Sequence, residues 1–450
     1  MESFWLFLIP YILTEEKVNI SAQSTLSKRL VQNSLHTGLA LGFVGIIPFA
    51  FNFLIARTFG KETLGYINVS ISFCLMITIF VTNFFGTAGT KFLAEYRGSK
   101  KLEHFKIVFR LIFAGPLVLT SAISIILIMN WEYFSNNFSL PSNLLFILIS
   151  YIFLRSYYII LRRVLYGVDL VRSYAINEAL SAIIMLVALL FVCLTEKKEF
   201  LIHCYLMSYT FFCLLSFNTL YRKYKSITNK LILTEEVNEL KVIQSFSKYG
   251  FVSMIGTVAS TSTSYISLII IGIHLSHSDA GIYSSVLTIV SILMFFPKLF
   301  TQVFLPEFSK LFGEGQNKKI FQIFNKTNTI MIFLSALICF LVFTFSNNIL
   351  SIFGKEFSEG SLILRILIPS LFIRMISIPF VSFLSGTKYV LYPNIGGIII
   401  LIISSICWLL LVPSYSLIGI AIGYTTGIII GIGYQIFIAI LKIKSFSTDY

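Results

Sequence analysis

Long runs of apolar residues, separated by short polar segments, follow one another along the whole chain. Each run is long enough, in a window of about 19 residues, to cross a hydrocarbon core of about 30 Å as a helix. The pattern predicts an all-α integral membrane protein with about twelve transmembrane helices. The predicted spans are residues 36–56, 64–86, 107–130, 142–161, 174–194, 200–220, 249–273, 281–304, 329–346, 361–384, 389–412 and 417–441.

Basic residues are distributed unequally between the two sides of this predicted bundle. One set of alternate loops, together with the N-terminal segment and Arg110 at the start of the third span, holds 25 of the 34 Lys and Arg residues, whereas the opposite loops hold five. Loops rich in Lys and Arg stay in the cytoplasm, so both termini are predicted to be cytoplasmic. The net charge of +14 is therefore a consequence of topology, and we expect no binding of nucleic acid. Four basic residues remain inside the predicted spans: Arg155, Lys298, Arg365 and Arg374.

Composition supports the same class of protein. Hydrophobic residues make up 56% of the chain and charged residues 12%, about half of the charged fraction of a typical soluble protein. The six cysteines all lie in apolar runs without metal-binding spacing, so we interpret them as small buried side chains, not disulfides or ligands. Abundant Ile, Phe, Lys and Asn are typical of an A/T-rich genome, and we expect a bacterial cytoplasmic (inner) membrane.

The chain resembles itself at an offset of about 216–219 residues. The segment FLRSYYIILRRVLYGVDLVRSYAIN (153–177) aligns with FIRMISIPFVSFLSGTKYVLYPNIG (372–396), which places Arg155 opposite Arg374. Two further matches occur in the same order: 58–70 with 275–286, which pairs Gly65 with Gly281, and 92–105 with 307–324. Three matches at nearly one offset indicate two repeats.

Each repeat contains six predicted spans, and an even number makes the repeats parallel, related by an axis along the membrane normal. The predicted organisation is a cytoplasmic N-terminal segment (1–34), a first six-helix lobe (35–225), a cytoplasmic linker (226–247), a second lobe (248–441) and a cytoplasmic tail (442–450). The glycines at equivalent places in the two repeats are interpreted as turn or helix-end residues. These glycines are Gly65, Gly281, Gly167 and Gly386.

Arg155 and Arg374 occupy equivalent places near the middle of the fourth and tenth spans. An arginine near the bilayer centre costs about 2.5–3.5 kcal/mol on insertion scales, so its presence favours a functional site. Glu178 alone among the 20 Asp and Glu residues lies well inside a span, which leaves few partners for structural ion pairs. We therefore predict that the two arginines line a cationic cavity between the lobes. Guanidinium groups bind phosphate bidentately and keep their charge, which favours an anionic ligand.

The residues around Arg155 extend this hypothesis. Tyr151, Tyr158 and Arg162 lie at positions i−4, i+3 and i+7 from it, on one face of a helix, and the equivalent stripe around Arg374 carries two serines. The pair Arg162–Arg163 is interpreted as the cytoplasmic end of the fourth span. Lys298 is a further candidate ligand, with snorkelling to the inner surface as the alternative. Arg365 lies about one turn from the outer surface, so we favour the interpretation that its side chain extends to that surface.

Several segments resemble one family. FGKETLGYINV after the first span, GTKFLAEYRGSKK after the second, and AGIY…LPEFSKLFGEG…KK in the second repeat are similar to the polysaccharide-biosynthesis branch of the MOP superfamily. SIFGKEFSEGSLILRILIPS and LSGTKYVLYPN…LVPSYSLIGIAIGY fit the same pattern, so the resemblance extends from about residue 30 over nearly the whole chain. This branch includes the Wzx-type flippases of O-antigen and capsule repeat units.

The resemblance implies a MATE-like, V-shaped pair of six-helix lobes. Such a protein would move a polyprenyl-pyrophosphate-linked oligosaccharide from the cytoplasmic to the outer leaflet by alternating access, for synthesis of lipopolysaccharide O-antigen or capsule. Arg155 and Arg374 would hold the pyrophosphate, the lipid tail would stay in the bilayer, and Tyr151 and Tyr158 would stack on sugar rings. Expected partners include a polysaccharide polymerase and chain-length proteins. No cofactor is implied beyond proton or sodium coupling, for which Glu178 is the candidate.

Two other functions compete with this interpretation. A MATE-like exporter of cations or drugs would use buried carboxylates, and Glu178, which can instead pair with Arg162 or Arg172, is weak support for one. A membrane polymerase or ligase would carry catalytic residues on a large outer loop, but the outer loops are short and contain no catalytic motif. His274 and His277 form the nearest approach to a metal site, and a solvated loop is the simpler interpretation. We predict a transporter, not an enzyme.

Overall fold

The computed structural model describes residues 20–99, 101–138, 140, 142–228, 238–295, 308, 311–312, 314, 316–387, 389 and 391–448. Within these residues every regular element is a helix, which confirms the predicted all-α class. The candidate ligand Lys298 lies outside the described residues.

The helices follow the order of the predicted spans. In the first half of the chain they are α2 (Ile20–Gly98), α3 (Leu102–Met129), α4 (Trp131–Asn137), η1 (Ser142–Leu144), α5 (Leu145–Gly167), α6 (Val171–Thr195), η2 (Lys198–Phe200) and α7 (Leu201–Thr228). In the second half they are α8 (Glu239–His274), α9 (His277–Leu293), α11 (Asn317–Thr344), α12 (Ser346–Ser351), η3 (Lys355–Gly360), α13 (Ser361–Ile376), α14 (Ile378–Gly386) and α15 (Leu391–Thr448). Residues 239–247 of the predicted linker belong to α8.

Eight of the described helices are long and apolar enough to cross a membrane, and α13 with α14, bent by 42°, forms a ninth span. Two of the eight contain a backbone break, at Gly60 in α2 (φ 78°) and at Ser416 in α15 (φ 47°). The backbone at Gly60 is in a region that is essentially restricted to glycine. Each break separates two predicted spans. Within the described residues, every predicted span therefore falls on a helix, a bent pair or one part of a broken helix.

Local sequence signals begin two helices of the second half. At the start of α9, the Ser276 hydroxyl accepts a hydrogen bond from the amide of Asp279, and the Asp279 carboxylate accepts one from the Ser276 amide, forming a capping box. At the start of α8, Asn238 accepts a hydrogen bond from the amide of Lys241. These caps fix the points at which α8 and α9 begin.

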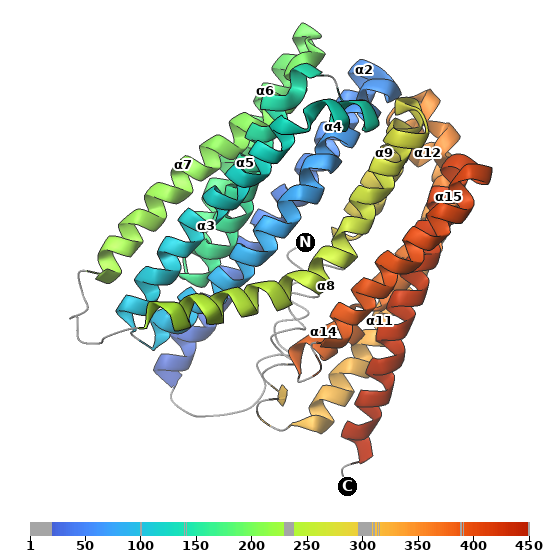
Figure 1. Cartoon of the computed structure of the whole chain (residues 1–450). Helices are drawn as coiled ribbons and strands as arrows, with labels where there is room; N and C mark the ends of the chain where they lie inside the picture. Colours follow the sequence, from blue (N-terminus) through green and yellow to red (C-terminus); the bar gives the residue numbers. More distant parts are fainter. Residues whose placement is uncertain are drawn as a thin grey trace.

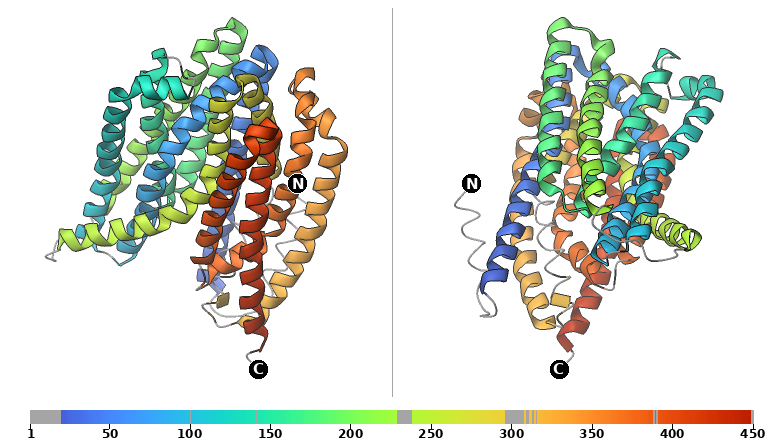
Figure 2. Two further views of the ribbon diagram at one scale, coloured as in Figure 1. Left: turned by 45° about the vertical axis from the view of Figure 1, so that its right-hand side comes forward. Right: turned by 90° about the vertical axis from the view of Figure 1, so that its left-hand side faces the viewer.

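The helices form two sets that correspond to the halves of the chain (Figure 1). In the first set α2 packs on α3, α5 and α6, while α7 packs on α5 and α6. In the second set α15 packs on α8, α13 and α14, and α11 packs on α13. Helix α2 joins the sets because it also packs on α8 and α9. Figures 1 and 2 show the sets lying close together at one end and diverging towards the end that carries the C-terminus.

The outer surface of the bundle is strongly apolar. Large hydrophobic side chains stay exposed on helices of both halves, among them Leu194 (85%), Met129 (78%) and Leu409 (78%). Continuous exposure of such residues along the long helices is what a lipid environment requires. The chain is therefore a multi-pass membrane protein. All six cysteines are free thiols, and Cys74, Cys204 and Cys339 are buried as predicted, whereas Cys193, Cys213 and Cys407 are only partly buried.

A reciprocal glycine contact marks the place where α2 crosses α9. A Cβ atom at Gly65 would lie 1.8 Å from the carbonyl oxygen of His277, and a Cβ atom at Gly281 would lie 1.9 Å from that of Lys61. In both directions, the contact runs from a glycine to the carbonyl four residues before the other glycine. This symmetry supports the predicted repeat and places both glycines beside the axis that relates the halves.

The reciprocal contact corrects one sequence interpretation. Gly65 and Gly281 lie inside α2 and α9, not at turns or helix ends, and glycine is required there because two backbones approach closely. The interpretation is confirmed for the other pair, since Gly167 ends α5 and Gly386 ends α14.

Polar contacts beside the crossing also join the two halves. Lys61 Nζ lies 3.0 Å from a carboxylate oxygen of Glu359, and the Lys61 amide donates to Glu356 at 3.1 Å. Arg57 Nε donates to the carbonyl of Ile352 at 2.6 Å. These contacts are exposed, so each adds little stability alone. They reinforce the closed end at which the halves meet.

Replacing Gly65 by Ala should destabilise the crossing, because the added methyl group overlaps backbone that cannot rotate away. We expect a loss of about 1–3 kcal/mol, typical of overpacking, seen as a lower melting temperature of the purified protein. Gly433→Ala is the matched control, since a Cβ atom there meets nothing within 4 Å. Equal melting temperatures for the two variants would contradict the close approach of the halves.

Candidate functional site

Arg155 lies on α5 within a cluster of tyrosine side chains. Its guanidinium donates a hydrogen bond to the hydroxyl of Tyr209 on α7 at 2.8 Å. The guanidinium carbon also lies 5.2 Å from the ring centroids of Tyr158 and Tyr209, a cation–π arrangement. Tyr265 of α8 is close enough to interact electrostatically with Arg155. Arg155 therefore points towards a helix of the second half.

Arg374 lies near the end of α13, just before the bend into α14. Its guanidinium carbon is 5.6 Å from the ring centroid of Tyr424 on α15. The Tyr424 hydroxyl in turn shares a hydrogen bond of 3.1 Å with Ser264 on α8. The Nε atom of Arg374 is buried and has no hydrogen-bond partner among the described residues. A buried cationic donor without a partner destabilises the folded protein, so this N–H group is suited to donate a hydrogen bond to an anionic ligand.

The two arginines are linked indirectly to adjacent residues of α8. Tyr265 interacts electrostatically with Arg155, and Ser264, the residue before it, shares a hydrogen bond with Tyr424, whose ring lies beside Arg374.

A second charged group lies further along α5. Arg162 Nε is 3.6 Å from Glu178 of α6, and an Arg162 amine donates to the hydroxyl of Tyr174 at 3.0 Å. The hydroxyl of Tyr158 donates to the other carboxylate oxygen of Glu178. Glu178 is thus paired with Arg162, one of the two partners the sequence suggested. The Arg162 side chain is 16% exposed and that of Glu178 is 3% exposed.

Arg163 is held by α2. It donates to the carbonyl of Thr82 at 3.1 Å, to the hydroxyl of Thr87 at 2.8 Å and to the amide oxygen of Asn83 at 2.9 Å. The sequence interpretation placed Arg162 and Arg163 at the cytoplasmic end of the fourth span, and α5 continues from them to Gly167. Their side chains turn into the bundle, because polar partners on neighbouring helices satisfy them.

The two predicted sugar-stacking tyrosines are deeply packed. Tyr151 is 1% exposed and makes edge contacts with Tyr205 and Tyr209 of α7, at 5.9 and 5.7 Å between ring centroids. Tyr158 is 6% exposed and uses its hydroxyl on Glu178. Tyr205 and Tyr209 of α7 were not predicted from the sequence, although their spacing of four residues inside a span indicates that they share one helix face.

The two other tyrosines beside the arginines, Tyr265 and Tyr424, were also missed. Neither belongs to the aligned segments of the repeat, and no local pattern distinguishes them from packing residues. Their partners are distant in sequence: Ser264 and Tyr424 are 160 residues apart. Contacts of this kind become visible only in the folded chain.

Arg365 behaves as the sequence predicted. It is exposed near the start of α13, donates to the Ser346 hydroxyl at 2.9 Å and stacks over Phe343 at 5.3 Å. It is a surface residue outside the tyrosine clusters. Among the described residues no three His, Cys, Asp or Glu side chains form a metal-binding group, and His277 instead contacts the ring of Tyr66.

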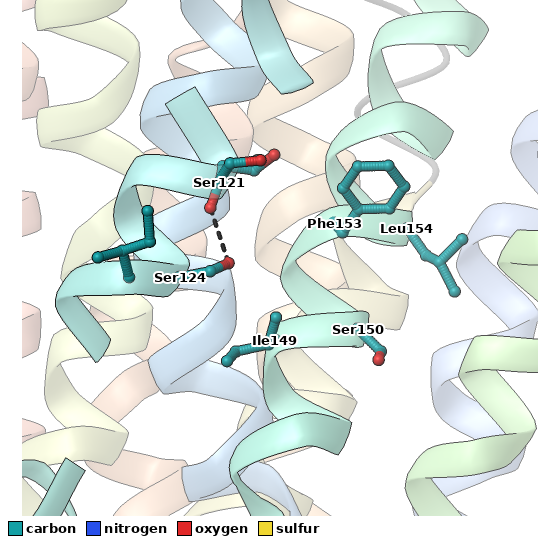
Figure 3. Close-up of a pocket in the computed structure, with 8 residues that line it drawn as sticks. Ser121, Ser124, Ile149, Ser150, Phe153 and Leu154 are labelled. Atoms are coloured by element: carbon teal, nitrogen blue, oxygen red, sulfur yellow. Dashed lines mark hydrogen bonds between the residues drawn. The ribbon is translucent and has the colours of Figure 1, made fainter. Parts of the chain in front are cut away.

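A shallow groove lies between α3 and α5, away from the arginines. Figure 3 shows Ser121, Ser124, Ser150 and Phe153 around it. The Ser124 hydroxyl donates to the carbonyl of Thr120 at 2.8 Å, so it is already satisfied within its own helix. The groove contains no charged group, and it therefore contributes nothing to an anion site.

Solved structures place this arrangement in a known fold. An inward-facing multidrug resistance transporter of the MATE family, in the MOP superfamily, superposes with a TM-score of 0.75 at 13% identity, covering 90% of this chain and 96% of its own. The lipid II flippase MurJ in an inward closed conformation superposes with a TM-score of 0.63 at 18% identity, covering 93% and 90%. The chain therefore has a MATE-like fold.

Sequence comparison then identifies the family. Residues 30–312 match the family model described as polysaccharide biosynthesis protein, and residues 253–413 match the MatE model. The first match covers more than half of the chain, so the protein belongs to the polysaccharide biosynthesis protein family. The probable low-salt glycan biosynthesis flippase Agl15 of Haloferax volcanii is 30% identical over 124 residues, 27% of this chain and 26% of the relative. The match therefore spans about a quarter of that relative.

Replacing Arg163 by Ala should destabilise the protein, because three buried acceptors on α2 lose their donor. Each unsatisfied buried group costs about 1–3 kcal/mol, so we expect a clearly lower melting temperature. Arg172→Ala, at an exposed position on α6, is the control and should change the melting temperature little. If both variants melt alike, the contacts of Arg163 with α2 do not hold the helices together.

Proposed function

We propose that the protein is a flippase that translocates a polyprenyl-pyrophosphate-linked oligosaccharide across the bacterial cytoplasmic membrane. Transport would run from the cytoplasmic to the outer leaflet by alternating access of the two halves and would supply a surface polysaccharide such as O-antigen or capsule. Arg155 and Arg374 would bind the pyrophosphate, and the lipid tail would remain in the bilayer. The polymerase and chain-length proteins that extend such polymers would be its partners.

The observation that carries this proposal is the pair of equivalent arginines facing α8. Both keep their charge, Arg155 lies against the rings of Tyr158 and Tyr209 and Arg374 against that of Tyr424, and neither is paired with a carboxylate among the described residues. A permanent positive charge without a carboxylate partner favours binding of an anion, and guanidinium groups match the geometry of phosphate. The family match and the glycan flippase relative support a lipid-linked glycan as the carrier of that anion.

The orientation is part of the proposal. The basic loops favour cytoplasmic termini, so the end at which the halves meet, beside Gly65 and Gly281, would face the outer leaflet. The diverging end would then face the cytoplasm, from which the lipid-linked precursor comes. Tyr151 and Tyr158 would support the arginines through packing.

An exporter of cations is the second candidate, since the solved MATE structures include multidrug transporters. Cation export needs a carboxylate that is free to bind its substrate or a proton. Glu178 is the one fully buried carboxylate among the described residues, and Arg162 already neutralises it. The electrostatics therefore favour the flippase.

The proposal is tested by measuring the lipid-linked oligosaccharide pool in cells that lack the gene and carry plasmid-borne variants. Arg155→Ala combined with Arg374→Ala should leave the intermediate accumulated and surface polysaccharide reduced, as in the deletion, because the pyrophosphate has lost its cationic site. Arg365→Ala, which removes an exposed arginine of the same helix α13, should restore transport like the wild type.

Two results would contradict these assignments. If the double variant restores surface polysaccharide fully while the deletion accumulates the intermediate, the arginines are structural and the transport function stands. If the deletion leaves the pool unchanged but makes cells sensitive to cationic drugs, the protein is an exporter. Comparable membrane levels of all variants must be shown by immunoblot.

A further inference from the structure

The middle of α8 carries a run of hydroxyl side chains. Residues 260–265 read STSTSY, inside a helix that is long and apolar enough to cross a membrane. The segment 253–265 contains no Asp, Glu, Lys or Arg. Helix α8 packs on α2 of the first set and on α15 of the second. The run of hydroxyl groups therefore lies between the two halves of the chain.

Some of these hydroxyl groups serve packing. Ser262, Thr263 and Ser267 are buried and donate to carbonyls of their own helix, at 3.3, 3.2 and 2.8 Å. Such bonds are common for Ser and Thr in membrane helices. Ser264 shares its bond with Tyr424 of α15. The polar groups of these four serine and threonine side chains are satisfied within the protein.

Thr257, Thr261 and Tyr265 form a different face of α8, which we call the hydroxyl face. They are four residues apart, so they point to one side of the helix and extend over about 12 Å along it. Thr257 and Thr261 are exposed, and Tyr265 is partly buried. Thr257 donates a long bond of 3.3 Å to the carbonyl of Ser253, and the hydroxyls of Thr261 and Tyr265 have no hydrogen-bond partner among the described residues. The hydroxyl face is therefore free to bind a ligand.

The composition of an exposed helix face distinguishes lipid from an internal space. On α7 the exposed side chains include Met207, Leu214 and Phe217, which is what contact with lipid requires. Thr210 lies among them and donates to the carbonyl four residues before it at 2.7 Å. The hydroxyl face of α8 instead carries polar groups at three successive positions, and polar groups inside a membrane span face a hydrated cavity.

The hydroxyl face ends at the proposed pyrophosphate site. Tyr265 interacts electrostatically with Arg155 and with Tyr209, whose hydroxyl accepts a hydrogen bond from Arg155 at 2.8 Å. Thr261 and Thr257 follow about 6 and 12 Å nearer to the start of α8, which lies towards the diverging end of the bundle (Figure 1). A ligand whose phosphate binds Arg155 can therefore extend along Thr261 and Thr257.

The chemistry of the face favours an uncharged ligand rich in hydroxyl groups. A threonine hydroxyl donates one hydrogen bond and accepts others, as does a sugar hydroxyl. Because residues 253–265 hold no charged side chain, they offer no counter-ion to an anion or a cation. Tyr151 and Tyr158, the residues first predicted to contact sugar, are only 1% and 6% exposed and are not accessible to a glycan.

We propose that Thr257, Thr261 and Tyr265 form the binding site for the sugar units next to the pyrophosphate. Tyr265 lies at the junction of the pyrophosphate and the first sugar, and the two threonines bind hydroxyl groups of the glycan nearer to the diverging end. This inference rests on the proposed function and adds to it the place at which the carbohydrate is recognised. The arginines bind any polyprenyl pyrophosphate, and the hydroxyl face provides the preference for the glycosylated one.

The experiment compares two lipids as ligands of the purified full-length protein in lipid nanodiscs. One is bare polyprenyl pyrophosphate, and the other is the lipid-linked oligosaccharide extracted from cells that lack the gene. The wild type should bind the glycosylated lipid about tenfold more tightly, as expected from one or two net hydrogen bonds. Thr257→Val combined with Thr261→Val removes two hydroxyl groups at nearly unchanged shape. This double variant should bind both lipids alike, with wild-type affinity for the bare lipid.

Thr210→Val is the matched control, because it removes an exposed threonine hydroxyl from the lipid-facing side of α7. This variant should keep the tenfold preference. Wild-type affinity for the bare lipid shows that a variant is folded. If the double variant does not fold, Tyr265→Phe tests the same face, since it removes one hydroxyl, keeps the ring and should reduce the preference.

The outcomes separate this inference from the proposed function. Equal binding of the two lipids by the wild type would overturn it, as would a full preference in the double variant. Arg155→Ala should weaken binding of both lipids and keep the preference between them. If Arg155→Ala binds both lipids normally while the threonine variant loses the preference, the hydroxyl face stands and the assignment of Arg155 fails. If cells that lack the gene accumulate no lipid-linked oligosaccharide, the proposed function fails and this inference with it.

Discussion

A buried guanidinium group keeps its charge, and every arginine inside this helical bundle therefore needs compensation from its surroundings. The structure provides it to different degrees. Arg163 is satisfied by three neutral acceptors, and Arg162 by a loose pairing with Glu178. Arg155 and Arg374 rest mainly against tyrosine rings, and among the described residues the Nε atom of Arg374 has no hydrogen-bond partner. In that part of the chain neither arginine has a carboxylate partner, and both are linked indirectly to adjacent residues of α8.

The internal symmetry explains why two such arginines exist. The halves are related by an axis beside Gly65 and Gly281, whose backbones touch reciprocally. Arg155 and Arg374 hold equivalent places in the two repeats, so the same axis brings both towards the middle of the molecule. The surroundings differ, because α5 is continuous whereas α13 and α14 are bent by 42°. Equivalent charges thus face α8 in different settings, which suits a substrate that is itself asymmetric.

Much of the fold follows directly from the sequence. The spans, the repeat and the two equivalent arginines are visible because hydropathy, charge placement and self-similarity are local properties. The reciprocal contact of Gly65 with Gly281 could have been predicted, since equivalent residues on neighbouring helices meet at a pseudo-two-fold axis. The inward orientation of the Arg162 and Arg163 side chains could not be predicted, because it depends on partners brought by α2 and α6 from distant parts of the chain. The same holds for the tyrosines that α8 and α15 place beside the two arginines.

The central claim is that Arg155 and Arg374 recognise a pyrophosphate. The most direct measurement is the affinity of the protein in nanodiscs for three lipids with the same polyprenyl chain, ending in pyrophosphate, monophosphate or alcohol. The account predicts that affinity falls at each loss of a phosphate in the wild type and that the Arg155→Ala, Arg374→Ala double variant binds all three alike. Equal affinities for the three lipids in the wild type would contradict it, because recognition would then rest on the chain and not on the charge.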